Sequence, residues 1–360
     1  GFKDALGGLL TNFKPTQTKL TPFFSNLLPE ETMRHYLAER AGVNPAREFF
    51  LLWVLGQDLA GAITVEPADG EALPPNVHQG IDDETEIELP MRFSLAGVQL
   101  KFSAVQQANG GVTIPATGKG GSWIVKLPSS RFDAVPEYSM MELARMLGMD
   151  VPETQLLPIN QIANIPDGIG KFGDAFKNAQ AFVIKRFDRA GDQAVHIEDF
   201  AQVFGVYPQD KYKKASMRNI AQVIGIEGQD EDIAEFTRRL VFNTLIGNAD
   251  MHLKNWSVIY KDKRAASIAP AYDFVSTIPY IPDDSASLKV SRSKKFSDFT
   301  LDELSHLAAK AMLPEKLVLD TAKQTVAGFH EIWAKEKAHL PLTKSMIEAI
   351  ETHLRNIPLR

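Results

Sequence analysis

The sequence predicts an α+β protein of two lobes, a strand-rich first lobe and a helical second lobe. Between residues 88 and 187, apolar and β-branched residues come in short runs separated by turn signals, with one helical segment among them. Beyond Asp199, apolar residues recur at helical spacing over long segments. We expect an N-terminal subdomain over residues 1–80, the strand-rich lobe over 81–190 and the helical lobe over 191–360.

In the strand-rich lobe we expect a Gly-containing turn at 109–111 and a helix from Glu137 to Leu147 that ends at Gly148. The expected strands are Met91–Phe93, Val98–Val105, Val112–Pro115, Trp123–Leu127, Thr154–Ile159 and Ala181–Phe187.

Helical periodicity also covers Pro29–Leu55, before the strands, and ends at Gly56. In the second lobe the expected helices are Ile233–Gly247, Leu301–Met312, Pro314–Glu336 and Thr343–Asn356. Two pairs have the capping-box spacing at the start of these helices, Thr300 with Glu303 and Ser345 with Glu348.

Composition excludes several classes of protein. The 360 residues include no cysteine, which excludes disulfides, thiolate zinc sites and cysteine nucleophiles. The net charge of −6 argues against a chain that grips DNA alone, because such proteins present a basic face to the phosphates. No signal peptide and no apolar run of the length of a bilayer are present, so we expect a cytoplasmic protein without a membrane partner. Three short basic clusters are expected to be solvated surface, Lys211–Lys214, Lys261–Arg264 and Arg292–Lys295.

The strongest chemical signal is the segment Gly247–Trp256. Asp250 and Asn255 have the D-x-x-x-x-N spacing of the catalytic loop of protein kinases. In such a loop the aspartate accepts the proton of the attacking hydroxyl, and the asparagine offers its amide oxygen to magnesium. Lys254 stands where it can neutralise charge on the transferred phosphoryl group. A Gly-Asn turn followed by Asp is otherwise an ordinary helix exit, so the spacing needs support from elsewhere in the chain.

Asp273 supplies that support. It is a lone acid among apolar neighbours after Pro270, and burying a carboxylate is costly unless it is paired or binds a metal. It resembles the metal-binding aspartate of the kinase D-F-G motif, with Val275 where glycine is usual. The alternative is an aspartate that only forms a turn.

A lysine inside an apolar strand is the third signal. Lys126 lies in Trp123–Leu127, just before the expected Glu137 helix. Its ammonium group is placed to reach nucleotide phosphates, and Glu137 could pair with it. A lysine at a strand edge that extends to water is the competing interpretation.

The segment Ser94–Lys101 contains a Gly turn between strands, which can point backbone N–H groups at phosphates. The stretch Thr117–Gly121 is not a Walker A loop, because Thr113 stands where the first glycine of that motif belongs.

Taken in order, these motifs resemble the HipA family of bacterial serine/threonine kinases, from about Phe23 to the C-terminus. Phe23–Glu30 is similar to the family's "FF-x-NLLP" segment, and Ser94–Lys101 to its "S-x-AG-x-Q-x-K" phosphate loop. The segments Ile184–Arg189 ("RFDR"), His196–Phe200, Asp250–Asn255 ("D-x-H-x-K-N") and Tyr272–Asp273 fall in the family's order as well.

The resemblance implies a two-lobed protein-kinase-like fold of the phosphatidylinositol-kinase type, with ATP and Mg²⁺ as cofactors. It implies that Asp250 and Lys254 are catalytic, that Asn255 and Asp273 bind metal, and that Ser94 is autophosphorylated. It implies a nucleotide site lined by Ala96, Gly97, Val98, Gln99, Leu100, Lys101, Lys126, Lys185, Arg186, Phe187, His252, Asn255, Tyr272 and Asp273.

The resemblance also implies partners. The protein substrate would be an aminoacyl-tRNA synthetase, with glutamyl-tRNA synthetase as the family precedent. The toxin would pair with a HipB-like helix-turn-helix antitoxin, which supplies most of the contact with operator DNA. The longest family members have more sequence before the "NLLP" segment, so the N-terminal subdomain is expected to be trimmed or reduced.

Three other functions compete with this one. A small-molecule or lipid kinase would use Lys126, Asp250, Asn255 and Asp273 in the same way, although no basic groove for phosphoinositide headgroups is evident. A catalytically inactive module that binds nucleotide and antitoxin as a co-repressor would retain the fold. A zinc hydrolase is disfavoured, because His330-Glu331 lacks the second histidine of the H-E-x-x-H motif.

Overall fold

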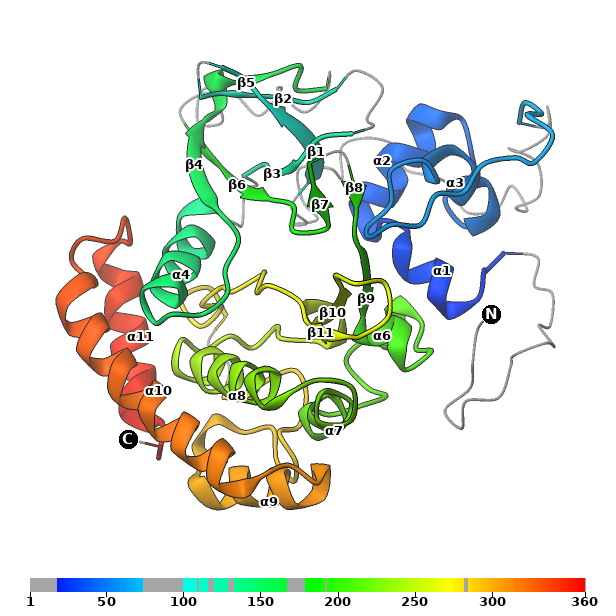
Figure 1. Cartoon of the computed structure of the whole chain (residues 1–360). Helices are drawn as coiled ribbons and strands as arrows, with labels where there is room; N and C mark the ends of the chain where they lie inside the picture. Colours follow the sequence, from blue (N-terminus) through cyan, green and yellow to red (C-terminus); the bar gives the residue numbers. More distant parts are fainter. Residues whose placement is uncertain are drawn as a thin grey trace, which may run out of the picture.

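A computed structural model describes residues 18–73, 100–108, 110–115, 120–128, 133–166, 179–191, 193–281 and 284–359. A strand-rich lobe lies above a helical lobe, and three short helices near the N-terminus lie beside them (Figure 1). The predicted two-lobed α+β architecture is confirmed. The expected strand Met91–Phe93 lies outside the described residues.

Six strands form one sheet in the strand-rich lobe, in the order β4-β6-β3-β1-β2-β5. β3 pairs antiparallel with both β1 and β6, and its Lys126 stands opposite Lys101 of β1. The sheet contains fully buried side chains such as Val125 and Phe182. The strands are β1 (Lys101–Gln106), β2 (Val112–Thr113), β3 (Trp123–Lys126), β4 (Thr154–Pro158), β5 (Ile162–Ala163) and β6 (Gln180–Lys185).

The five predicted strands that are present differ from the prediction at one or both ends, and β5 was not predicted. β2 and β6 each end two residues earlier than predicted. β2 has two residues instead of four, and β6 ends at Lys185, where the chain leaves the sheet in a turn at Phe187 and Asp188. The expected turn before β2 is present, with Gly110 at a φ of 89°. A side chain is strained at such an angle, which explains the glycine.

Helix α4 (Ala134–Met146) connects the two lobes. It begins three residues before the predicted start, because Asp133 caps it by accepting a hydrogen bond from the Val135 N–H. It ends before Gly148, which has a φ of 76°. Met140, Met141 and Leu143 are fully buried and belong to the hydrophobic core of the helical lobe. Each such side chain contributes roughly 1.5–3 kcal/mol on burial, so α4 is firmly held and Glu137 on it has a fixed position.

The helical lobe contains the predicted helices and a small sheet in the order β11-β10-β9. Thr300 caps α9 by accepting a hydrogen bond from the Glu303 N–H, as predicted. The predicted capping box at Ser345 is wrong, because Thr343 is the capping residue of α11 and bonds the Met346 N–H. The elements are β9 (His196–Asp199), α6 (Phe200–Val203), α7 (Met217–Glu227), α8 (Asp230–Leu245), β10 (Ser257–Tyr260), β11 (Ser267–Ile268), α9 (Leu301–Ala311), α10 (Glu315–Glu336) and α11 (Lys344–Asn356).

The N-terminal part contains three helices where one was expected. α1 (Pro22–Leu27), α2 (Glu31–Ala41) and α3 (Glu48–Leu55) share a small core. The single predicted helix over Pro29–Leu55 is therefore wrong. Gly42 adopts a φ of 66° and ends α2, and a turn precedes α3. Buried Glu48 of α3 accepts hydrogen bonds from Leu20, Ser25 and Arg34, which ties the subdomain together.

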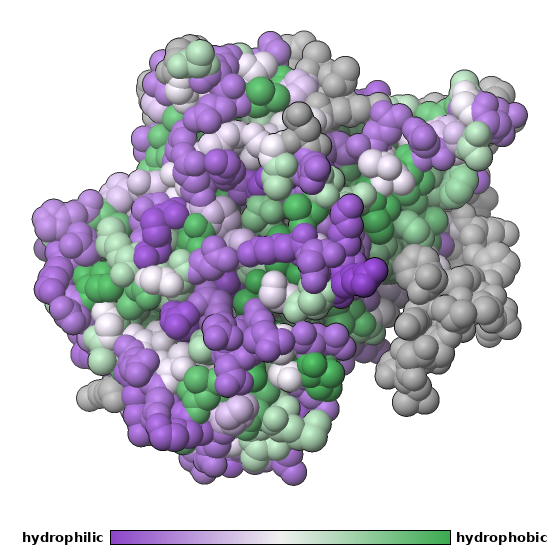
Figure 2. Space-filling view, in the orientation of Figure 1, coloured by the Kyte–Doolittle hydropathy of each residue, from purple (hydrophilic) through white to green (hydrophobic). Residues whose placement is uncertain are grey.

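The visible surface is mostly hydrophilic. Figure 2 shows hydrophilic residues over most of the visible face of the helical lobe, with hydrophobic residues in smaller patches. Within the part of the chain that the structure describes, no helix is both long and apolar enough to cross a lipid bilayer.

Candidate active site

Lys126 is a buried cation between two carboxylates. Its Nζ atom lies 2.5 Å from Oε1 of Glu137 and also bonds Oδ1 of Asp273. Lys126 is 5% exposed and Glu137 is 7% exposed. Burial alone would lower the pKa of Lys126, but the charges of Asp273 and Glu137 outweigh it and raise this pKa. Lys126 therefore stays charged.

The strand register explains why an anion is needed beside Lys126. Lys101 on β1 is its cross-strand neighbour, and like charges at opposed positions of a sheet repel. Oδ2 of Asp273 lies 3.9 Å from Nζ of Lys101, so one aspartate faces both lysines. Burial would raise the pKa of Asp273, but Lys101 and Lys126 together hold it below its usual range. The carboxylate is thus ionised at neutral pH.

The backbone at Asp273 is unusual. Its φ is 56°, in the left-handed region that residues other than glycine rarely adopt. Its carbonyl oxygen accepts a hydrogen bond of 3.3 Å from Nδ2 of Asn248. Such conformations cost roughly 1–3 kcal/mol and cluster at functional sites. The conformation directs the Asp273 carboxylate towards the lysines of the strand-rich lobe.

The segment that follows α8 folds into a loop held by amide side chains. Oδ1 of Asn248 accepts a bond of 3.1 Å from the Asp250 N–H, and Nδ2 of Asn248 donates to Oδ1 of Asn243 at 2.9 Å. Nδ2 of Asn255 donates to the Asp250 carbonyl at 3.1 Å. Asp250 and Asn255 therefore lie in one loop, and Asn248 links that loop to Asp273.

The Asp250 carboxylate bonds a tyrosine from outside its loop. Burial raises the pKa of Asp250, an effect that a hydrogen bond from the Tyr212 hydroxyl reduces. This bond measures 2.8 Å to Oδ1. A carboxylate with a raised pKa is a stronger proton acceptor, which suits a general base.

His252 has a buried imidazole in the same loop. Burial and the nearby charge of Lys211 lower the pKa of His252 to about 3, so the ring is neutral at physiological pH. Its Nδ1 atom has no hydrogen-bond partner among the described residues. A polar group of a bound ligand could supply the hydrogen bond that this buried nitrogen lacks.

Lys254 does not point to the Lys126 cluster. Its Nζ atom lies 2.7 Å from Oε1 of Glu30 and donates to the Asn26 carbonyl at 3.0 Å. Lys211 binds the other oxygen of Glu30 at 2.8 Å. Burial would raise the pKa of Glu30, but Lys254 and Lys211 lower it to about 2. The structure thus joins the "FF-x-NLLP" segment to the catalytic loop.

The predicted hinge residues separate into two groups. Lys185 is exposed and faces Glu153 at 3.5 Å, while the Phe187 ring lies 5.7 Å from the Tyr272 ring, between the lobes. Tyr272 is fixed by its hydroxyl, which donates to the Lys254 carbonyl at 2.9 Å. The Phe187–Tyr272 pair therefore lies beside the catalytic loop.

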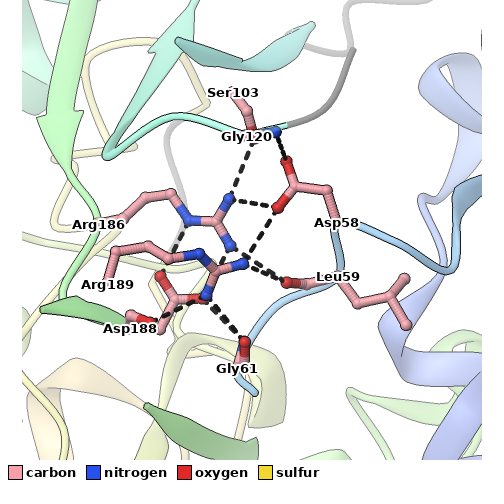
Figure 3. A network of polar contacts seen from close by, with 8 residues as sticks. All are labelled: Asp58, Leu59, Gly61, Ser103, Gly120, Arg186, Asp188 and Arg189. Atoms are coloured by element: carbon pink, nitrogen blue, oxygen red, sulfur yellow. Dashed lines mark hydrogen bonds and ion pairs between the residues drawn. The ribbon is translucent and has the colours of Figure 1, made fainter. Parts of the chain in front are cut away.

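The Arg186 side chain belongs to a separate network, which we call the clasp (Figure 3). Its guanidinium contacts the carboxylates of Asp58 and Asp188 at 2.9 Å and the Leu59 carbonyl at 3.1 Å. Arg189 contacts Asp58 at 3.1 Å and Asp188 at 3.0 Å. The Arg186 side chain is thus engaged with the N-terminal subdomain, and only its backbone is left to line a nucleotide site.

The clasp also reaches the sheet. Arg186 donates to the Ser103 hydroxyl at 3.2 Å, and the Gly120 N–H donates to Asp58 at 2.9 Å. Figure 3 shows these groups converging from the N-terminal segment, from the region of β1 and from the chain after β6. The clasp fixes the N-terminal subdomain against the strand-rich lobe.

The predicted phosphate loop is described only from Leu100 onwards. Leu100 is buried and immediately precedes β1, next to Lys101. The others lie outside the described residues, namely Ser94, Ala96, Gly97, Val98 and Gln99.

Three residues that contact the site have no signal in the sequence that predicts their role. Asn248 stands in the Gly-Asn turn that was read as a helix exit, and Glu30 was noted only within a family motif. Tyr212 lies in the basic cluster that was expected to be plain surface. None of these had a spacing signal, because each acts through a contact distant in sequence or through the backbone.

The donor set fits a magnesium ion that also binds nucleotide phosphates. Within the described residues, no three histidine or acidic side chains group as a complete metal site. Asp273 offers an ionised carboxylate, and the hydrogen bond from Nδ2 of Asn255 leaves Oδ1 as the atom to face a cation. One or two protein oxygens completed by phosphates and water are what magnesium takes in such sites.

Comparison with known families agrees with these motifs. Residues 93–333 match the model of the HipA-like C-terminal domain, and residues 9–66 match the HipA N-terminal domain.

Individual relatives point the same way. The chain is 55% identical to the "Putative kinase Y4dM" of Sinorhizobium fredii, over 99% of this chain and 87% of the relative. It is 28% identical to the "Serine/threonine-protein kinase toxin HipA" of Shewanella oneidensis, over 74% of this chain and 65% of that protein. The solved complex of Shewanella oneidensis HipA, HipB and operator DNA shares the fold with a TM-score of 0.71 at 22% identity, over 93% of this chain and 83% of that one. The chain therefore belongs to the HipA family and has its two-lobed kinase-like fold.

Proposed function

We propose that this chain is an ATP- and magnesium-dependent protein serine/threonine kinase of the HipA toxin type. The observation that carries the proposal is the convergence of Lys126 from β3, Glu137 from α4 and Asp273 from the helical lobe on one buried cluster. The cluster stays partly open at Asp273, where Lys101 faces the same carboxylate, so a metal-bound, phosphate-bearing ligand can meet an anion and two cations there.

In this proposal the lobes bind ATP between them. Lys126 and Lys101 contact phosphate oxygens, and Glu137 orients Lys126. The backbone around Lys185 and the rings of Phe187 and Tyr272 contact the base. Asn255 and Asp273 would hold Mg²⁺, which neutralises charge on the phosphates when bound.

The protein residues carry the proton transfer. Asp250 accepts the proton of the acceptor hydroxyl while that oxygen forms a bond to the γ-phosphorus. The bond from the γ-phosphorus to the bridging oxygen breaks, and ADP leaves with that oxygen. Asn248 keeps the Asp250 backbone in place. We assign Lys254 a positioning role through Glu30, in preference to direct contact with phosphate, because its ammonium group is already paired.

The family suggests the partners. We propose a small DNA-binding antitoxin of the HipB kind, which would bring the chain to operator DNA, and an aminoacyl-tRNA synthetase as the phosphorylated protein. Autophosphorylation at Ser94 is the proposed switch, since a phosphate there would place about two negative charges beside those of ATP.

Intact-mass spectrometry after incubation with magnesium-ATP tests the activity. We expect wild type to gain about one phosphate, and Asp250→Asn and Ser94→Ala to gain none at that position. Phosphatase-treated wild type that binds nucleotide but transfers nothing, to itself or to a synthetase, would instead favour a nucleotide-binding co-repressor.

A further inference from the structure

The base of the proposed reaction already has a hydroxyl bound to it. Tyr212 donates from its phenol to Oδ1 of Asp250 at 2.8 Å. Tyr212 lies between η4 (Pro208–Asp210) and α7, so it comes from outside the catalytic loop. Tyr212 is 42% exposed, so solvent reaches this residue.

Several contacts fix Tyr212 in this position. Its ring lies edge-on to the His252 ring at 5.1 Å. The Nζ atom of Lys211 lies 5.4 Å from the centre of the Tyr212 ring and is itself bound to Glu30. The Leu253 N–H donates to the Lys211 carbonyl at 3.4 Å, which ties the two segments together. The contact with Asp250 is therefore built into the fold of both segments.

The geometry is that of a general base with its acceptor. A base that removes a proton lies about 2.6–3.2 Å from the oxygen that carries it. The Tyr212 oxygen meets this condition, and among the described residues it is the side-chain hydroxyl that bonds Asp250. An acceptor serine or threonine needs a hydrogen bond to the same carboxylate.

We propose that the Tyr212 hydroxyl occupies the place of the acceptor hydroxyl at Asp250, and that a serine or threonine of the substrate enters by displacing it. This inference rests on the kinase function proposed above and assigns the acceptor side of the site to the segment 211–214. Lys213 and Lys214 on this segment are exposed and face the solvent from which the acceptor arrives.

One consequence concerns water. While Tyr212 bonds Asp250, an attacking water molecule cannot take the acceptor position on Oδ1 that the phenol fills, so ATP hydrolysis is slowed in the absence of substrate. Removing only the phenol oxygen leaves the ring on His252 and opens a space for water next to the base.

The test compares ATP hydrolysis by full-length wild type and Tyr212→Phe at saturating magnesium-ATP, without any protein acceptor. We expect hydrolysis to rise about three- to tenfold in Tyr212→Phe, the size of one partly exposed hydrogen bond to a charged group. Thermal unfolding checks that both proteins are folded. Tyr260→Phe is the matched control, because its phenol also bonds a carboxylate, that of Glu198, at the end of β10, and its hydrolysis should equal that of wild type.

A second measurement uses N-acetylserine amide, an acceptor hydroxyl without flanking residues. Its KM should fall three- to tenfold in Tyr212→Phe while kcat stays within about twofold. Equal or lower hydrolysis in Tyr212→Phe, an unchanged KM, or loss of kcat would overturn the inference, as would absence of hydrolysis in both proteins. The proposed kinase function fails separately, if wild type neither binds magnesium-ATP nor transfers phosphate to any protein.

Discussion

Two buried clusters of charged side chains lie near each other in this fold, and they differ in how completely they are satisfied. The clasp contains two arginines and two aspartates, Arg186, Arg189, Asp58 and Asp188, so its formal charges cancel. The cluster around Lys126 contains one buried lysine and two carboxylates, with Lys101 half exposed at its edge.

The two clusters differ in geometry. In the clasp, backbone N–H groups of Gly61 and Gly120 complete the carboxylates, and the Leu59 and Gly61 carbonyls complete the arginines (Figure 3). In the Lys126 cluster, Asp273 keeps 24% of its side chain exposed and has a left-handed backbone. Residue type alone therefore does not identify a ligand site. A closed cluster joins subdomains, whereas one that stays partly open to solvent is prepared for a ligand.

The largest expected effect is on the open cluster. Asp273→Asn should lower phosphate transfer about 10²–10³-fold, the loss typical of removing one preorganised charged contact. The free energy of unfolding should fall by about 1–2 kcal/mol, because Lys101 and Lys126 lose the anion between them, while Lys126 keeps Glu137 and asparagine tolerates the left-handed backbone. Transfer rates and urea unfolding measure the two quantities, and a large loss of stability would show that Asp273 is mainly structural.

The clasp should respond in the opposite way. Arg186→Met leaves Asp58 and Asp188 with too little positive charge in a buried place and should lower the free energy of unfolding by about 3–5 kcal/mol. The affinity of the folded protein for ATP should stay within about twofold of wild type. Lys185→Met, one residue earlier and exposed, is the control and should change stability by less than about 0.5 kcal/mol. Weaker ATP binding with unchanged stability would instead place Arg186 in the nucleotide site.

Acid titration tests the ion pairs of Glu30 with Lys254 and Lys211. Its pKa is about 2 in the folded protein against 4.5 when unperturbed, so its stabilising contribution is complete above pH 4.5 and is lost as the pH falls towards 2. At pH 7 the free energy of unfolding of wild type should exceed that of Glu30→Gln by about 1–3 kcal/mol. This range is reduced because Glu30 is partly exposed. The difference should shrink between pH 5 and pH 2, and a difference independent of pH would refute the pairing with Lys254 and Lys211.

Helix caps remote from both clusters give the smallest effect. Thr300→Ala and Thr343→Ala each remove a side-chain acceptor from a helix start and should cost about 1 kcal/mol. Phosphate transfer should be unchanged in both. The Ser345→Ala change should be neutral, because Ser345 is not the capping residue of α11.

Much of this structure was predictable from local patterns. Alternation and helical spacing predicted the lobes, and the spacing of Asp250 and Asn255 predicted that they lie in one loop. The pairing of Lys126 with Glu137 followed from their order along the chain. These predictions concern residues whose neighbours are close in sequence or are ordered by a known motif.

The rest depended on contacts between distant segments. Glu30 and Lys254 are separated by more than two hundred residues, and nothing in the local sequence of either predicts their ion pair. Arg186 stands in a hinge motif, yet its partner Asp58 lies in the loop after α3. The sequence predicted α3 as the end of one long helix and gave no sign that the loop after it contacts Arg186. The break at Gly42 was missed because the helical periodicity continues across it.

The central claim is that the Lys126 cluster, and not the clasp, receives the metal–nucleotide complex. Isothermal titration of ATP with and without magnesium, for wild type, Asp273→Asn and Asp58→Asn, tests it most directly. We expect magnesium to tighten ATP binding in wild type and Asp58→Asn, and to have no effect in Asp273→Asn. Magnesium-dependent binding that persists in Asp273→Asn, or is lost in Asp58→Asn, would contradict the account.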